Sequence, residues 1–528
     1  MFSRVHSAVC KGVEGADVYV EADISRGLPG IYIVGLASTM VMESKERIRS
    51  AIMNSGLEYP RGRITVNLTP ASLRKNGTGL DLPIAVAILA SYLYVDIDKA
   101  SQYGIAGELS LEGGVLGISG VLPMILCMKK SGLSKVIIPA DNVSEASLVS
   151  GIRIIPVRSL TECVSVINEG NAGCPDNGMF DINQGAEGMI ESARQSIKRS
   201  LEKSKAKAGD FADICGQEHA KRALTIAATG RHGLLMVGSP GCGKTMLASR
   251  LPGIMPEMSE AERIETAVIY SAAGKTNLGG DIPLARPFRS PHCSIGKAGL
   301  IGGGSIPVPG EITLAHNGVL FLDEVCEFDT GTIESLRTPM EEKKIVHFRR
   351  GDSYAFPSDF QLVMAANPCP CGFYGDSRRM CKCTQTQLDK YRKKLSGPMM
   401  DRIDMRISMA KVEFSELNGS DPDIRSRNIS TADMKRDVEA GIDFARRHGR
   451  AGYNADLTDS ETDVYCALGG EEEMFMKSAY DALKMTPRSY KKVLRVARTI
   501  ADIAGSEHIH QQHIAEALSY RMMEAVND

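Results

Sequence analysis

The 528-residue sequence has no strong net charge, no long apolar run and no internal repeat. Its 62 basic and 64 acidic residues leave a formal net charge of −2, so any nucleic-acid binding has to come from local basic patches. The longest apolar stretch, LPIAVAILASYLYV, stops at Asp96 and is too short to span a bilayer, which predicts a buried helix. The first residues, MFSRVHSAVCKG, contain no apolar core of signal-peptide length. These absences predict a soluble cytoplasmic protein without a membrane segment.

Most of the cysteines are isolated from one another in the sequence. Of the 13 cysteines, all but four stand singly along the chain, several of them in apolar surroundings. This distribution favours a reducing cytosol over a disulfide framework. Apolar residues make up 43% of the chain and charged residues 24%, the balance of a soluble globular protein. Because the chain is too long for one core, we expect about two to four domains.

The residue pattern divides the chain into three folded units joined by two linkers. Residues 1–168 alternate short β-branched runs, such as RITVNLT, with helical segments, and predict an α+β domain. Residues 169–208 are rich in Gly, Asn and charged residues, which predicts a linker. Residues 209–410 predict an α/β domain and 411–430 a second linker, and residues 431–528 show apolar residues at helical spacing. The predicted fold class is therefore a multidomain α/β protein with a helical C-terminal unit.

The strongest motif is GSPGCGKT, which follows the apolar run LLMV and precedes a helical segment. It matches the phosphate-loop pattern G-x-x-x-x-G-K-[ST] in the required strand–loop–helix context. Its glycines allow backbone N–H groups to converge on phosphate oxygens at a helix N-terminus. We expect Lys244 to contact the β- and γ-phosphates of ATP and Thr245 to bind Mg²⁺. The expected nucleotide-binding residues are Gly238, Ser239, Pro240, Gly241, Cys242, Gly243, Lys244, Thr245 and Met246.

Polar residues at the ends of two further apolar runs complete the predicted ATP site. GVLFLDEV ends in Asp323, expected in the Mg²⁺ shell, and Glu324, expected to polarise the attacking water. FQLVMAAN ends at Asn367, which is expected to orient that water. Considered alone, an acidic pair at a strand end is usually solvated, and an Asn there is usually a turn residue. The phosphate loop upstream favours the catalytic interpretation.

Five segments together resemble one family of ATPases. GSPGCGKT, GVLFLDE, LVMAANP, SGPMMDRID and TPRSYKKVLRVARTIADI resemble the magnesium-chelatase-like branch of AAA+ ATPases, and most closely the YifB/ComM family. The resemblance covers nearly the whole chain. It implies a P-loop AAA+ core with a helical lid, ATP and Mg²⁺ as cofactors, and a homo-hexameric ring. It also implies a DNA motor that drives branch migration of recombination intermediates during DNA uptake.

The same resemblance assigns roles to two arginines. Arg402 in DRID matches the arginine finger that acts on the γ-phosphate of a neighbouring subunit, and Arg488 in TPRSY matches the lid arginine that senses nucleotide. Charge that develops on a transferring phosphoryl group needs cations beyond Lys244, and a guanidinium supplies them in bidentate form. Surface salt bridges are the simpler interpretation of both arginines, and Arg337 is a second candidate for the intersubunit role.

Four cysteines form the pattern C-x-C-x₉-C-x-C between residues 369 and 383. Two close pairs of thiolates separated by Gly and Asp turn residues suit a tetrahedral structural Zn²⁺ site. The loop is too short and polar to bury a core, so a metal would supply its folding energy. The interpretation as an iron–sulfur site and that as a redox disulfide are weaker alternatives. The predicted zinc ligands are Cys369, Cys371, Cys381 and Cys383.

Two basic clusters are candidate DNA contacts. Arg378, Arg379 and Lys382 lie within the predicted zinc knuckle. A predicted β-hairpin, KIVHFR followed by RGDS and a return strand, resembles the pre-sensor hairpin that lines the pore in this AAA+ branch. Its basic residues are Lys343, Lys344, Arg349 and Arg350. An ordinary solvated surface explains both clusters about as well.

The N-terminal domain resembles the proteolytic domain of Lon-type proteases. An approximate alignment puts Gly79 where the protease carries its nucleophilic serine and Leu122 where it carries its lysine, while Thr78 and Lys129 lie nearby. A Ser–Lys pair needs an amine to deprotonate the hydroxyl, so we expect DNA engagement or ring scaffolding in place of peptidase activity. Two other functions stay open for the chain: a chelatase ATPase subunit and a protein-remodelling ATPase.

Overall fold

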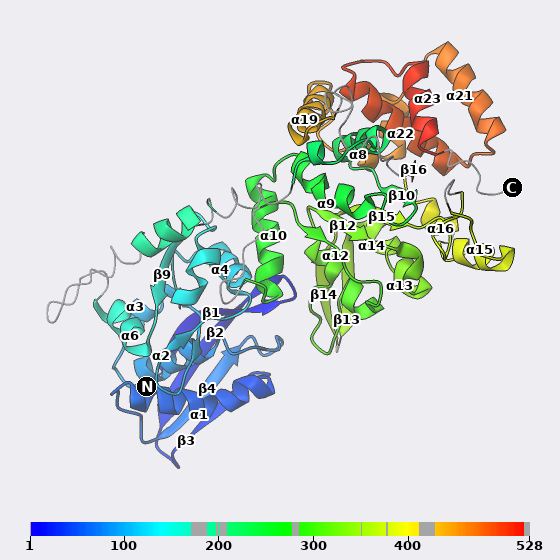
Figure 1. The fold of residues 1–528 in the computed structure, drawn as a ribbon. Helices are drawn as coiled ribbons and strands as arrows, with labels where there is room; N and C mark the ends of the chain where they lie inside the picture. The colour runs from blue at the N-terminus through cyan, green and yellow to red at the C-terminus, as the bar shows by residue number, and fades with distance from the viewer. Residues whose placement is uncertain are drawn as a thin grey trace.

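The structure is a computed structural model that describes residues 2–169, 187–196, 199, 209–276, 285–349, 351–375, 379–395, 397–410 and 428–521. Figure 1 shows an N-terminal α/β unit in blue and cyan, a central α/β unit in green, and a C-terminal group of helices in orange and red. The predicted linkers at 169–208 and 411–430 lie largely outside the described residues. No helix of the described part of the chain is both long and apolar enough to cross a membrane.

The N-terminal unit is built on a seven-stranded sheet. Its strands are β1 (Phe2–Lys11), β2 (Glu14–Ser25), β3 (Gly30–Val34), β4 (Arg63–Thr69), β5 (Tyr103–Ile105), β8 (Lys135–Pro139) and β9 (Arg153–Val157). They follow the order β3-β4-β2-β1-β5-β8-β9, and β2 pairs antiparallel with the whole length of β1. A short pair, β6 (Glu108–Leu109) and β7 (Val115–Leu116), lies beside the main sheet. The predicted β-branched strands are confirmed as β2, β3 and β4.

Helices cover this sheet. They are α1 (Thr39–Asn54), α2 (Asp81–Ser91), α3 (Ile97–Ala100), α4 (Val121–Lys130), α5 (Val143–Ala146) and α6 (Leu160–Glu169). Every residue of α2 is buried, so the apolar run confirms its prediction as a buried helix. Because α2 is apolar on all sides, it packs both on the β1–β2 pair and against α1.

The central unit contains a five-stranded parallel sheet. Its strands are β10 (Leu234–Gly238), β11 (Phe288–Arg289), β12 (Val319–Leu322), β15 (Gln361–Ala366) and β16 (Met405–Met409), in the order β11-β12-β15-β10-β16. In the described register β10 pairs with β15 on one side and β16 on the other. Residues of β12 and β15 are buried throughout, as expected of strands covered on both faces. The carboxyl ends of β10, β12 and β15 therefore meet at one edge, where such sheets bind ligands.

The helices of the central unit flank this sheet. They are α8 (Glu218–Gly230), α9 (Lys244–Ile254), α10 (Glu260–Ala272), α11 (Lys297–Ile301), α12 (Glu311–Leu314), α13 (Thr330–Glu334), α14 (Arg337–Glu342), α15 (Gln385–Arg392) and α16 (Gly397–Met400). The predicted hairpin is confirmed as the antiparallel pair β13 (Lys344–Arg349) and β14 (Asp352–Pro357). In Figure 1 it extends from the lower end of the central unit.

The C-terminal unit is helical, as its apolar spacing predicts. It contains α19 (Thr431–Arg447), α20 (Asp459–Tyr465), α21 (Gly470–Ala482), α22 (Pro487–Ile503) and α23 (Gln511–Ser519). Helix α22 is its centre, because it packs against α8, α19 and α23. The Lys492 ammonium on α22 lies 2.5 Å from Asp404 at the start of β16, and Asp404 also accepts the backbone N–H of Gly233 at 2.9 Å. This ion pair, shielded from solvent, fixes the helical unit to the sheet.

Among the described residues, the N-terminal unit contacts the central unit at helix α10 and at the hairpin. Helix α10 packs against α4, and Ser271 accepts the N–H of Gly120 with its carbonyl at 2.9 Å and that of Leu122 with its hydroxyl at 3.2 Å. Separately, Lys11 at the end of β1 forms a 2.7 Å ion pair with Asp352 on the hairpin. Figure 1 shows α10 reaching from the central unit to the N-terminal unit.

Candidate functional site

The phosphate-loop motif forms the turn between β10 and α9. Gly241 and Gly243 have φ angles of +82° and +93°, which residues with a side chain rarely adopt. The loop can therefore turn sharply and expose successive N–H groups at the N-terminus of α9. Lys244 begins that helix and is 8% exposed, and its ammonium donates to the carbonyls of Gly238 at 2.6 Å and Ser239 at 3.2 Å. The folded-back lysine lies in the concave face of the loop.

The structure brings the other predicted ATP-site residues to the same edge of the sheet. The Lys244 ammonium lies 3.1 Å from Oδ1 of Asn367, which follows β15. The Thr245 hydroxyl donates to the Asp323 carboxylate at 2.6 Å. A hydroxyl and a carboxylate in contact are hard oxygen ligands, which is the donor set that Mg²⁺ prefers. The residues present therefore fit an ATP–Mg²⁺ complex.

Glu324 occupies an unusual backbone conformation. Its φ angle is +49°, in the left-handed region, which costs a residue with a side chain about 1–2 kcal/mol. Its N–H donates to the Asp323 carboxylate at 2.9 Å, and the next two residues, Val325 and Cys326, are buried. These contacts hold the turn, and the Glu324 side chain stays exposed beside the Thr245–Asp323 pair. Strained conformations of this kind are concentrated at functional sites.

The two predicted arginines lie together, but at the other edge of the sheet. Glu341 on α14 bridges them, with Oε1 2.8 Å from Arg402 and 2.7 Å from Arg488. The hydrogen bond from Arg488, reinforced by Arg402, holds the pKa of Glu341 below its usual value. Arg337, the second candidate, instead pairs with Glu334 at 2.6 Å.

The position of Arg402 follows from the strand register. It lies just before β16, and the N–H groups of Asp404 and Met405 both donate to the Gly233 carbonyl at the start of β10. The phosphate loop begins at the opposite end of β10, four residue steps away, or about 13 Å. Arg402, with Arg488 beside it through Glu341, therefore lies near the amino end of β10, whereas the phosphate loop of the same chain begins at the carboxyl end. Sequence patterns gave no indication of Glu341, which lies in an unremarkable charged stretch.

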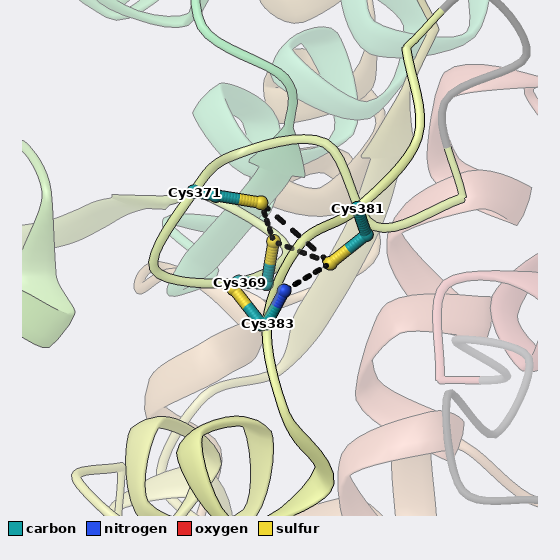
Figure 2. A group of neighbouring side chains, drawn as sticks. All are labelled: Cys369, Cys371, Cys381 and Cys383. Carbon is teal, nitrogen blue, oxygen red and sulfur yellow. Dashed lines mark hydrogen bonds between the residues drawn. The ribbon is translucent and has the colours of Figure 1, made fainter.

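The four cysteines converge as their spacing predicts (Figure 2). Their sulfur atoms all lie within 4.8 Å of one another. Cys369 Sγ is 3.3 Å from that of Cys371 and 3.7 Å from that of Cys381, and the last two are 3.6 Å apart. Four thiolates around Zn²⁺ at about 2.3 Å would be about 3.8 Å apart, so the cluster fits a tetrahedral metal site.

The predicted basic contacts have different surroundings. Lys343 is held by ion pairs with Asp359 at 3.4 Å and Asp456 at 2.8 Å. Lys344 and Arg349 lie on exposed positions of β13, and Lys382 is exposed between two cysteines. The Arg379 guanidinium lies 5.1 Å from the centre of the Phe373 ring. Arg350 and Arg378 lie outside the described residues.

Phe348 is a feature of the hairpin that sequence reasoning missed. Its side chain, near the tip of the hairpin, is 73% exposed, which is exceptional for a phenylalanine. Strand alternation places it on the same face as Lys344 and Val346. The alternation of KIVHFR contained this signal, because burial of Ile345 already requires exposure of Phe348.

In the protease-like region of the N-terminal unit, Thr78 and Lys129 do not form a catalytic hydroxyl–amine pair. Gly79 lines a cavity of about 290 Å³ together with Thr78 and Glu108, and Leu122 is fully buried. The Thr78 hydroxyl donates to the Glu108 carboxylate, while the Lys129 ammonium donates to the Ser150 carbonyl at 2.5 Å. Thr78 and Lys129 thus have separate partners.

Three family models and several full-length relatives match this chain. Family models for magnesium chelatase subunit ChlI match residues 210–417 and 20–142, and a model for the C-terminal part of that subunit matches residues 428–521. Competence protein ComM of Haemophilus influenzae is 40% identical over 98% of this chain and 97% of its own length. The uncharacterized protein YifB of Escherichia coli is 39% identical over 99% of this chain and 97% of its own. An archaeal Lon protease from Methanocaldococcus jannaschii is 28% identical over 26% of this chain and 22% of its own.

The full-length relatives and the family models agree on one assignment. The similarity to Lon proteases covers 26–31% of the chain, whereas the similarity to ComM and YifB covers 98–99% of it. An AAA+ unit of the magnesium-chelatase type implies ATP hydrolysis with Mg²⁺. The chain belongs to the YifB/ComM family of magnesium-chelatase-like AAA+ ATPases.

Proposed function

We propose that the chain is an ATP-driven DNA motor that works as a homo-hexameric ring and promotes branch migration of recombination intermediates. The ring is supported mainly by one observation: the residues expected to act in ATP hydrolysis are divided between two edges of one sheet. Lys244 and Asn367 lie at one edge, while Arg402 and Arg488 share Glu341 at the other. A head-to-tail contact between subunits would bring the two edges together, and such contacts form a ring when the rotation between successive subunits closes.

Each group has a role at the completed site. The phosphate loop and Lys244 hold the phosphates, and Thr245 and Asp323 supply oxygen ligands for Mg²⁺, which would neutralise charge on the phosphates. Glu324 accepts a proton from the attacking water, and Asn367 orients that water. Arg402, from the neighbouring subunit, stabilises charge on the transferring phosphoryl group, and Arg488 beside it reports the nucleotide state to the helical unit.

We assign DNA contact to the β13–β14 hairpin. The exposed Phe348 ring offers a surface for base stacking, and Lys344 and Arg349 on the same strand offer charge to the phosphate backbone. Lys343 is left out of this set because two carboxylates already neutralise it. Arg379 and Lys382 in the cysteine loop form the second candidate contact, on a loop that we propose Zn²⁺ stabilises.

The proposal that this motor drives branch migration rests on similarity to related proteins. One full-length relative is named a competence protein, and the family resemblance links such proteins to recombination of incoming DNA. A protein-remodelling activity is the alternative, since exposed basic surfaces also bind acidic proteins. It differs from the DNA motor in the substrate that stimulates ATP hydrolysis.

The test is movement of a DNA junction by the purified protein. Wild type with ATP and Mg²⁺ should resolve a labelled three-strand or four-way junction, and Lys244→Ala should not. ATP hydrolysis that neither moves the junction nor responds to DNA would contradict the proposal and direct attention to protein partners.

A further inference from the structure

The cysteine loop does not stand apart from the ATP site. Cys369 follows Asn367 by two residues, and its side chain is fully buried. The loop then turns at Gly372, whose N–H donates to the Cys369 carbonyl at 2.9 Å. A Cβ added to Gly372 would lie 2.7 Å from both Cγ and Cδ of Pro240, so the loop backbone packs directly on the ring of Pro240 in the phosphate loop.

The far side of the cysteine loop also touches the ATP site. The loop leads into α15, where Tyr391 is 7% exposed and packs in the same apolar core as Val325 and Ala366. The Tyr391 hydroxyl lies beside the Asn367 backbone and the Cys326 thiol. The segment that carries the cysteines is therefore fixed at both of its ends to the residues around Asn367 and Glu324.

The sulfur atoms have the surroundings of metal ligands. The N–H of Tyr374 donates to Cys369 Sγ at 3.3 Å, and that of Cys383 donates to Cys381 Sγ at 3.5 Å. Hydrogen bonds of this kind orient thiolates and balance their charge around a cation. Few apolar side chains hold the loop together, and Met380 between the two cysteine pairs is 90% exposed. Thiol–thiol contacts alone are weak, so the conformation of the loop between its two fixed ends depends on what the sulfur atoms bind.

We propose that one Zn²⁺ bound by the four cysteines braces the phosphate loop, so that the metal site sets the affinity of the ATP site for nucleotide. With zinc bound, the turn at Gly372 packs against Pro240 and holds it in position, and Asn367 stays beside Lys244. Without zinc the loop loses its fold, Pro240 loses its support, and the phosphate loop no longer presents its N–H groups together. This assignment concerns the ATP site alone and stands whether or not DNA is the substrate.

The first experiment removes the metal ligands. Cys381→Ser with Cys383→Ser should lower zinc from about one ion per chain to none, measured by elemental analysis. Affinity for a fluorescent ATP analogue should fall about 10- to 100-fold, the range that loss of outer-shell support costs at metal sites. Absence of zinc from the wild-type protein, or unchanged nucleotide affinity in a folded zinc-free variant, would overturn the proposal.

The second experiment tests the contact between the cysteine loop and Pro240 without removing zinc. It remains informative if the cysteine variant of the first experiment does not fold. Gly372→Ala keeps all four cysteines but places a methyl group against Pro240. Gly375→Ala is the matched control, because Gly375 lies in the same loop with a similar φ of +75° and has open space around it. Both variants should bind zinc, and only Gly372→Ala should lose nucleotide affinity. Equal affinity of the two variants would refute direct support of the phosphate loop.

Discussion

The separation of Arg402 from Lys244 allows a subunit-mixing experiment with a calculable result. Lys244→Ala removes the phosphate-binding cation, and Arg402→Ala removes the cation at the other edge of the sheet. Each substitution alone should lower the rate of ATP hydrolysis on the order of a thousandfold. An active interface can form in the mixture, because an Arg402→Ala subunit keeps its phosphate loop and a Lys244→Ala neighbour keeps its arginine.

The magnitude follows from the geometry of a head-to-tail ring. In a random 1:1 mixture, half of the subunits carry an intact phosphate loop, and half of their neighbours supply an intact arginine. About one quarter of the interfaces are then complete, so steady-state ATP hydrolysis should recover to about a quarter of the wild-type rate. If Arg402 served the nucleotide of its own chain, mixing would restore nothing.

The control uses a doubly substituted subunit. A mixture of Lys244→Ala with the double variant Lys244→Ala/Arg402→Ala contains no intact phosphate loop and should stay inactive. A 1:1 mixture of the two single variants that is no faster than either alone, with rings present by light scattering, would refute the assignment of Arg402 to the neighbouring site.

Further predictions concern stability and DNA. Asp404→Asn leaves the shielded Lys492 ammonium unpaired and should cost about 3–5 kcal/mol in denaturant unfolding, whereas Asp463→Asn at an exposed ion pair should cost less than about 1 kcal/mol. Burial would raise the pKa of Asp404, but its basic neighbours Lys492 and His232 outweigh this effect and hold the pKa well below its usual value. The difference in unfolding free energy between wild type and Asp404→Asn should therefore have its full size above about pH 4 and should decrease as the pH falls further. Phe348→Ala should weaken binding of single-stranded DNA by about 1–3 kcal/mol in a fluorescence titration, while Val346→Ala at the less exposed neighbouring position should not; equal affinities would remove Phe348 from the DNA contact.

Local motifs account for what the sequence predicts well. The phosphate loop and the cysteine cluster are specified by spacing within one short segment, so their geometry follows from local backbone chemistry. The contact around Glu341 joins α14, the segment before β16 and α22, which are far apart in the chain, and only the folded sheet brings them together. No local pattern could indicate it.

Strand β1 shows a second reason why a structural element can escape prediction from the sequence. The stretch MFSRVHSAVCKG includes polar residues that are buried in the structure, among them Ser3 and Ser7. Because β1 lies between β2 and β5 in the middle of the sheet, its residues 5–9 are all buried and do not alternate between apolar and polar. Ser3 is accommodated by a hydrogen bond to the Ala87 carbonyl at 2.7 Å, a partner on α2 that the sequence does not reveal.

The two contacts of the N-terminal unit have a mechanical consequence. Ser271 attaches that unit to a helix packed beside the ATPase sheet, while Lys11 attaches it to the hairpin through Asp352. A shift of the hairpin relative to α10 would require either that the N-terminal unit turns with it or that the contacts to the hairpin break, among them the 2.7 Å ion pair. A displacement of the hairpin relative to α10 would therefore change the orientation of the N-terminal unit.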